Sequence, residues 1–197
     1  MRHYGRRSIL LSSGLIAVQC ISTVYMASRA NESNLEECMP SSFSISEIIE
    51  QRPIPPNSDI YMAPGDSIAI KSVHPKCKYY PTNIIVKPEE VYEFDSGGSW
   101  KDGWLPSSSP EGWNGLVLNL FNRLSGKNFF VLCGSIGKTD LTAFKIGKKM
   151  RWKVPQNAAG ESGYLFLFPN DTDHAKFRKN NREVESNPLR VKIKRIS

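Results

Sequence analysis

Three residues near the C-terminal end of the chain carry side-chain oxygen atoms that could hold a metal ion. Asp171 directly follows an apolar run, and Asn180 and Asn181 come after the loop 172–179. One carboxylate with amide and backbone carbonyl oxygens suits Ca²⁺ better than zinc or iron, because Ca²⁺ is a hard cation that takes oxygen ligands. The sequence therefore predicts a calcium site here. The alternative is an ordinary polar connection in which Asn and Asp form turns.

The element that must position Asp171 is the segment 164–168, an aromatic run bounded by Gly163 and Pro169 that is typical of a buried strand. Similar short runs recur, separated by Gly, Pro, Asn or Asp, whereas only 44–51 has the spacing of a short helix. This pattern indicates an all-β fold, an antiparallel β-sandwich or barrel. We predict strands at 67–73, 83–86, 91–95, 116–120, 129–136, 142–146, 150–154, 164–168 and 189–196.

Trp100, Trp104 and Trp113 flank a loop rich in Gly, Ser and Pro. Their flat apolar faces could stack on a sugar ring while each indole N–H forms a hydrogen bond. The alternative is packing in the core or at its rim. We predict that Trp104 and Trp113 contact a sugar, together with Thr172 and Asp173 beside the calcium loop.

Residues 1–30 have the pattern of a secretion signal, since three Arg precede the apolar stretch 9–27 and small residues surround Arg29. We predict cleavage, a secreted or periplasmic protein, and no stable membrane span afterwards. An uncleaved anchor is the alternative, because about 20 apolar residues can span a bilayer. We assign residues 31–65 to an N-terminal arm and linker, and 66–197 to the β-sandwich domain.

More than half of the net positive charge of the chain lies in the signal. The whole chain has 26 basic and 19 acidic residues, a net charge of +7, and removing the four Arg of residues 1–30 leaves +3. The basic residues of the last predicted strand alternate, which places them on a solvated face. We therefore expect no nucleic-acid partner.

Three cysteines remain after the signal, and export would place them in an oxidising compartment. Cys133 lies inside the apolar run 129–136, so we predict a buried free thiol. We predict a Cys38–Cys77 disulfide that ties the arm to the domain. Other pairings and three free thiols remain alternatives.

The order of several segments resembles one known family. The pattern begins with a turn, a Pro, acidic residues and a strand, and ends with the Asp and the Asn pair. It comprises Thr82 to Phe94, Gly98-Ser99-Trp100, Ala143 to Gly147, Trp152 to Pro155, Gly163 to Asp171 and Asn180-Asn181. This series is similar to the galactophilic, calcium-dependent bacterial lectins of the pseudomonad type-I kind, and it covers roughly residues 66–196.

The resemblance implies a jelly-roll-like, galactose-binding-domain-like sandwich that binds a galactose-type sugar through one Ca²⁺ and catalyses no reaction. Asp171, Asn180 and Asn181 would supply side-chain ligands, and backbone carbonyls near Phe177 and Gly103 would complete the shell. Two sugar hydroxyls would then occupy further positions on the cation. Since sugar modules often gain avidity by multiplicity, self-association into a homo-oligomer is plausible.

Two other functions compete with the lectin hypothesis. A secreted β-sandwich that contacts other proteins would share the fold without binding sugar. An ester hydrolase would use Ser67, in Gly65-Asp66-Ser67, with Asp171 and His174 as the other members of a catalytic triad. That hydrolase class requires a parallel sheet with helices, which this strand-rich pattern does not favour, so we expect no enzyme.

Overall fold

The computed structural model describes residues 58–103, 105–114, 122–156, 163–172 and 178–197. They all belong to one compact unit of the chain, Glu36–Ser197. Strands dominate this part of the chain, with one short 3-10 helix, η3 (Asp140–Thr142). The strands are β1 (Ser67–Ile70), β2 (Tyr80–Ile85), β3 (Val91–Gly97), β4 (Trp100–Asp102), β5 (Ser107–Ser108), β6 (Leu132–Ile136), β7 (Phe144–Lys145), β8 (Lys149–Lys153), β9 (Tyr164–Pro169), β10 (Asn181–Glu183) and β11 (Arg190–Arg195).

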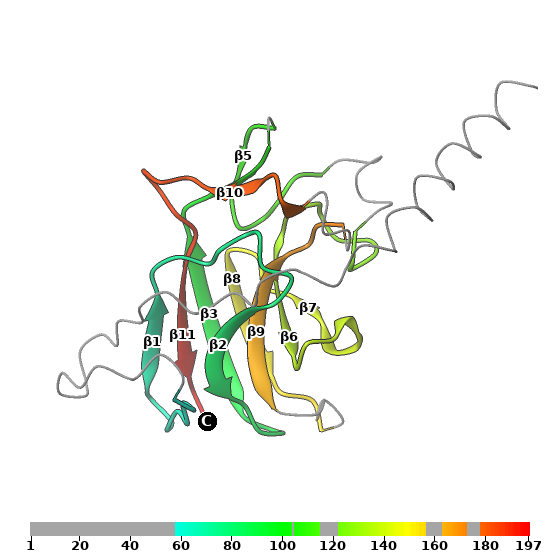
Figure 1. The fold of residues 1–197 in the computed structure, drawn as a ribbon. Coiled ribbons are helices and arrows are strands. Elements are labelled where there is room, and N and C mark those ends of the chain that lie inside the picture. Colours follow the sequence, from blue (N-terminus) through cyan, green and yellow to red (C-terminus); the bar gives the residue numbers. More distant parts are fainter. Residues whose placement is uncertain (1–57, 104, 115–121, 157–162, 173–177) are drawn as a thin grey trace, which may run out of the picture. The chain divides into compact units, whose positions relative to one another are not determined.

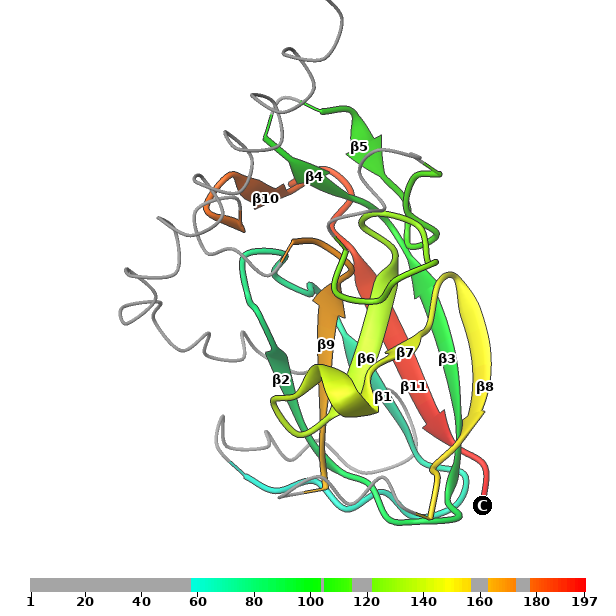
Figure 2. The same cartoon turned by 90° about the vertical axis from the view of Figure 1, so that its right-hand side faces the viewer.

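The fold is all-β, and neighbouring strands in each sheet pair antiparallel, as predicted. Two four-stranded sheets have the orders β1-β11-β3-β8 and β2-β9-β6-β7. A three-stranded sheet, β10-β4-β5, lies at one end of them (Figures 1 and 2). Among the described residues, no helix combines the length and apolar character needed to cross a bilayer.

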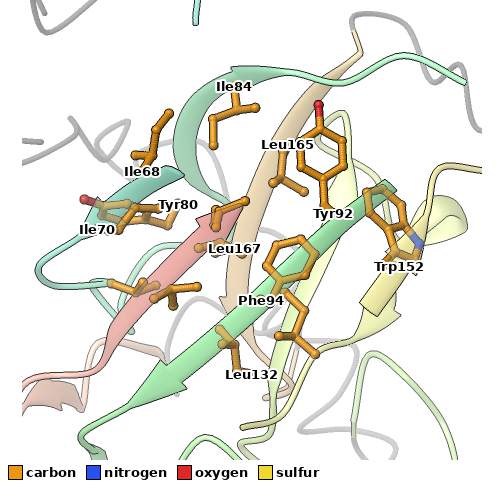
Figure 3. Packing of buried hydrophobic residues seen from close by; sticks show 14 of the residues in the cluster. Ile68, Ile70, Tyr80, Ile84, Tyr92, Phe94, Leu132, Trp152, Leu165 and Leu167 are labelled. Atoms are coloured by element: carbon orange, nitrogen blue, oxygen red, sulfur yellow. The ribbon is translucent and has the colours of Figure 1, made fainter. Parts of the chain in front are cut away.

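The two larger sheets pack face to face around one apolar core. Alternation along the strands produces this core: in β11, Val191 and Ile193 point inward while Arg190, Lys192 and Lys194 are exposed, as the sequence predicted. Figure 3 shows side chains of both sheets meeting across the core. They include Ile68, Ile70, Tyr92, Phe94 and Trp152 from one sheet and Tyr80, Ile84, Leu132, Leu165 and Leu167 from the other.

The strand that precedes Asp171 is buried on both faces. Leu165 and Leu167 of β9 face the main core, whereas Phe168 packs on the other side with Val131 and Cys133. Cys133 is a free thiol with no exposed surface, which confirms the prediction. Because both faces of β9 are covered, its sequence is a continuous apolar run and does not alternate between apolar and polar residues.

Several strand boundaries differ from those predicted. The segment 129–136 enters a strand only at Leu132, because Phe130 has a positive φ of 62° that interrupts extended backbone. The short strands β4, β5 and β10 lack an apolar alternation and were not predicted. Ile60 and Met62, within the predicted linker, are buried, so the packed region extends N-terminally from residue 66. The predicted strand 116–120 and helix 44–51 lie outside the described residues.

Candidate functional site

Two polar side chains, Asp171 and Asn181, meet where the sandwich joins the three-stranded sheet, and Asp102 lies nearby. Asp171 lies two residues beyond the end of β9, and Asn181 is the first residue of β10. β10 pairs with β4 so that Asn181 stands directly opposite Asp102. Directly opposed residues of antiparallel strands project to the same face, with Cβ atoms about 4.5–5.5 Å apart. The register thus brings Asp102 to the site.

Asp171 and Asn181 are in direct contact and are enclosed by protein. The Asn181 Nδ2 donates to Asp171 Oδ2 at 2.8 Å and to the Pro75 carbonyl oxygen at 3.2 Å. The Thr172 N–H donates to the other carboxylate oxygen, Asp171 Oδ1, at 2.6 Å. Asp171 is 1% exposed and Asn181 is fully buried. The structure thus brings the Asp and the second Asn of the predicted ligand set into contact.

The amide oxygen of Asn181 has no hydrogen-bond donor. Asn181 Oδ1 is one of the buried side-chain atoms without a partner in the described part of the chain. Leaving a buried acceptor unsatisfied costs about 1–3 kcal/mol, so such atoms are uncommon in native interiors. A bound cation would satisfy this oxygen, because a metal ion accepts the lone pair that no donor reaches.

Two carboxylates share this region. Burial and, to a smaller extent, the negative charge of Asp171 raise the pKa of Asp102 to about 6. Burial also raises the pKa of Asp171, against the hydrogen bonds from Asn181 and Thr172 and the positive charges of Arg178 and Arg123. Ionising both carboxylates is therefore costly, and a cation held near them would lower that cost.

The donor set fits a hard cation such as Ca²⁺. It comprises two carboxylates and one amide oxygen, with the Gly103 carbonyl next to Asp102; that carbonyl accepts from Arg182 Nη2 at 3.3 Å. No group of three His, Cys, Asp or Glu side chains with metal-site geometry occurs in the described ranges. Ca²⁺ tolerates such a mixed shell of charged and neutral oxygens, whereas zinc and iron prefer nitrogen or sulfur ligands.

The turn that carries Asp171 is fixed by its buried neighbour Asn170. The Leu124 N–H donates to Asn170 Oδ1 at 2.8 Å, and Asn170 Nδ2 donates to the carbonyls of Leu124 and Asn128 at 3.1 and 3.0 Å. The Phe130 N–H donates to the Asn170 carbonyl at 2.8 Å. These contacts hold the end of β9 to the segment 122–130.

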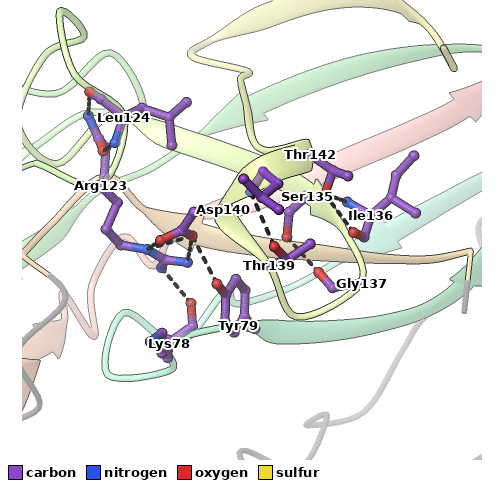
Figure 4. A network of polar contacts seen from close by, with 12 residues as sticks. Lys78, Tyr79, Arg123, Leu124, Ser135, Ile136, Gly137, Thr139, Asp140 and Thr142 are labelled. Atoms are coloured by element: carbon purple, nitrogen blue, oxygen red, sulfur yellow. Dashed lines mark hydrogen bonds and ion pairs between the residues drawn. The ribbon is translucent and has the colours of Figure 1, made fainter. Parts of the chain in front are cut away.

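A second anchor for this turn is Arg123, shown in Figure 4. Its backbone N–H donates to the Asp171 carbonyl at 3.3 Å. Its side chain donates to the Lys78 carbonyl at 2.7 Å and pairs with Asp140, which also accepts from the Tyr79 hydroxyl at 2.9 Å. The segment 75–78 is therefore held by Arg123 at Lys78 and by Asn181 at Pro75, and it forms another wall of the site.

Two other predicted residues, the metal ligand Asn180 and the sugar contact Thr172, join the site through backbone atoms. The Asn180 side chain is exposed, and Asn180 joins the site through its backbone, because its carbonyl accepts from the Gly103 N–H at 3.0 Å. Thr172 contacts Asp171 through its N–H. Phe177, Trp104 and Asp173 lie outside the described residues.

Trp113 contacts other aromatic rings. Its ring stacks on Phe129 and Phe130 with centroids 5.8 and 5.7 Å apart, so protein occupies part of its surface, as in the packing alternative. Trp100 is fully buried and its indole N–H donates to the Phe130 carbonyl at 3.1 Å, which makes it a core residue. Sugar stacking by Trp113 stays a prediction.

Cys77 is disulfide-bonded, and Cys38, its predicted partner, lies outside the described residues. Cys77 lies next to Lys78, so the bond constrains the segment 75–78 that borders the site. The remaining described cysteine, Cys133, is free.

Asp102 was missed by the sequence analysis. Asp102 immediately precedes Gly103, whose carbonyl was expected near the cation. A carboxylate next to a predicted ligand could have suggested a second acidic ligand. The role of Asp102 depends on pairing with Asn181, which is distant in sequence. β4 and β10 have only three residues each, so they contain no apolar alternation that would predict how they pair.

The hydrolase alternative does not gain support from the arrangement. Ser67 pairs with Lys194, whereas the opposite end of β11, Arg190, pairs with Gly97 on the side of β4. Ser67 begins β1 and Asp171 follows the end of β9, and these two strand ends lie at opposite ends of the sandwich (Figure 1). These two residues do not form a triad, and His174 lies outside the described residues.

Comparison with known proteins identifies no family. No protein-family model and no curated protein matches the sequence. A solved structure described as "EclA N-terminal domain; PllA-like lectin" is similar with 20% sequence identity and a TM-score of 0.43, over 66% of this chain and 94% of that one.

Proposed function

We propose that this chain is an exported carbohydrate-binding module in which Ca²⁺ assists recognition of a galactose-type sugar. The observation that carries the proposal is the buried contact between Asp171 and Asn181, with the Asn181 amide oxygen left without a donor. A purely structural Asp–Asn pair would satisfy both amide groups, whereas a cation-binding pair keeps an oxygen available.

The chain's own residues would hold and orient the cation. Asp171 and Asn181 are fixed by the Thr172 N–H and the Pro75 carbonyl, so their oxygens need little reorganisation on binding. When bound, Ca²⁺ offers coordination positions that two adjacent sugar hydroxyls can fill. The galactose-type ligand is inferred from the ordered resemblance to the galactophilic lectins, with Trp104, Thr172 and Asp173 as sugar contacts.

Export is the second component of the proposal. The pattern of residues 1–30 supports it, and so does the disulfide at Cys77, because disulfides persist in oxidising compartments. We therefore place the mature protein outside the cytoplasm, either secreted or periplasmic.

Thermal unfolding of the chain without residues 1–30, with Ca²⁺ and with chelator, tests the cation. We expect Ca²⁺ to raise the free energy of unfolding by about 2.7 kcal/mol at 100 times its dissociation constant. Asp171→Asn should abolish this shift. Asp95→Asn should retain it, because Asp95 is exposed on β3 and pairs with Lys149 at 3.7 Å. An unchanged melting temperature in the wild type would refute the calcium role.

A glycan array tests the ligand. We expect galactose-terminated glycans to bind in Ca²⁺, to be lost in chelator, and to be lost with Asp171→Asn. A Ca²⁺-dependent thermal shift without any glycan signal would reduce the cation to a structural role and would refute carbohydrate binding.

A further inference from the structure

The carboxylate of Asp102 has no ion-pair or hydrogen-bond partner in the described part of the chain. The exposed carboxylates of the large sheet, by contrast, face basic neighbours: Asp95 pairs with Lys149 and Glu93 with Arg151. Asp102 is half-buried at the end of β4, so its lack of a partner is more costly than at an exposed position.

Asp102 lies opposite one residue of the site and close to the charge of another. Asn181 is its cross-strand partner, and the Asn181 amide touches the Asp171 carboxylate at 2.8 Å. The charges of the two carboxylates repel each other. Arg178 is buried near Asp171, and both Arg178 and Arg123 supply positive charge there.

An independent feature of the same place points to a ligand. Asn181 is fully buried, and its Oδ1 has no hydrogen-bond donor. One buried amide oxygen without a donor and two mutually repelling carboxylates therefore lie near one another. A multivalent cation would satisfy the amide oxygen and relieve the repulsion at once, because it accepts the amide lone pair and attracts both carboxylates.

We propose that Asp102 is a second carboxylate ligand of the cation site, so that Asp102, Asp171 and the Asn181 amide oxygen hold the ion together. The inference rests on the calcium role in the proposed function and extends it. Two carboxylates make the charge of the site match a divalent ion, which favours Ca²⁺ over monovalent cations.

Calorimetric titration of Ca²⁺ into the chain without residues 1–30 tests this assignment. Asp102→Asn keeps the size of the side chain and removes its charge, so we expect Ca²⁺ affinity to fall about tenfold or more. Asp95→Asn, which removes an exposed carboxylate of the same type, should leave the affinity unchanged.

Thermal unfolding of the same variants separates ligation from a structural role. In chelator, Asp102→Asn should melt at the same temperature as the wild type or higher, since repulsion with Asp171 is gone. In saturating Ca²⁺ it should melt lower than the wild type. A structural role would instead lower both melting temperatures.

The outcomes distinguish the two proposals. Wild-type binding with equal affinity in Asp102→Asn overturns the role of Asp102 and leaves the calcium site of Asp171 standing. No calorimetric binding in the wild type overturns the calcium role itself, and the role of Asp102 with it.

Discussion

Arg123 is an enclosed cation whose charge is balanced by Asp140. The Arg123 side chain is 1% exposed, and its guanidinium carbon lies 3.8 Å from the centroid of Phe168 and 4.4 Å from that of Tyr79. Burial alone would raise the pKa of Asp140, but the hydrogen bonds and charge of Arg123 outweigh it and lower that pKa. Since Arg123 also bonds the Asp171 backbone, this pair supports the site.

Asp140→Asn should therefore destabilise the protein, by about 1–2 kcal/mol at pH 7. This is less than the 3–5 kcal/mol typical of a fully buried pair, because the Asp140 side chain is 36% exposed. The lowered pKa means that the ionised carboxylate stabilises the fold above its unfolded pKa of about 3.9, and that this stability is lost as pH falls below it.

Urea unfolding of the wild type and Asp140→Asn at pH 7 and pH 3 measures this effect. The difference in unfolding free energy between them should shrink at pH 3, because Asp140 of the unfolded wild type is then largely protonated and the native carboxylate loses part of its stabilising effect. Asp95→Asn should change stability by less than about 0.5 kcal/mol at either pH. An equal difference at both pH values would contradict the ionic role of Asp140.

At the residue scale, the sequence predicts side chains that act through type and local spacing. The sequence indicated Asp171 and Asn181, which are in contact, because an aromatic strand leads to the first and a short loop separates it from the second. It did not indicate Asp102, Asn170 or Arg123, because their roles depend on contacts with residues far along the chain. An Asp before a Gly and an Asn before an Asp look like turn residues until their tertiary partners are known.

The turn between β3 and β4 joins the large sheet to the three-stranded sheet. Gly98 has a φ of 85°, and a Cβ atom there would overlap the Pro188 carbonyl oxygen. The neighbouring Ser99 N–H donates to the Asn187 carbonyl at 2.9 Å. The chain leading from β10 to β11 thus passes directly against this turn, and only glycine fits at the point of contact.

Gly98→Ala should destabilise the protein by about 1–3 kcal/mol, because a left-handed backbone and a steric overlap act together. Gly97→Ala is the matched control, since a Cβ atom there would meet nothing within 4 Å. We expect it to change stability by no more than about 0.5 kcal/mol. Chemical denaturation of the two variants measures the difference, and equal effects would show that the turn tolerates a side chain.

At the element scale, the sequence predicted the strands whose burial leaves a clear apolar pattern. The alternation in β11 and the continuous apolar run in β9 are both visible in the sequence. Prediction failed for β4, β5 and β10, because strands of two or three residues are defined by their pairing partners. The site lies among these short strands, so the sequence could predict the scaffold better than the site.

The whole domain depends on one core shared by the two large sheets. The order β1-β11-β3-β8 places the last strand between the first and the third, and the order β2-β9-β6-β7 likewise pairs strands distant in sequence. Because each sheet combines early and late segments of the chain, neither sheet can form independently. We expect a single cooperative unfolding transition.

Leu167→Ala tests whether the two sheets unfold in one cooperative transition. Leu167 is fully buried between the sheets, and removing its side chain should cost about 2–5 kcal/mol through lost burial and the cavity left behind. Leu141→Ala deletes the same atoms at a position that is 96% exposed, so its effect should be less than about 0.5 kcal/mol. Far-UV and near-UV circular dichroism should report coincident transitions at a lower denaturant midpoint for Leu167→Ala. Separate transitions would mean that the two sheets unfold independently, because a core that both sheets share must be lost in one step.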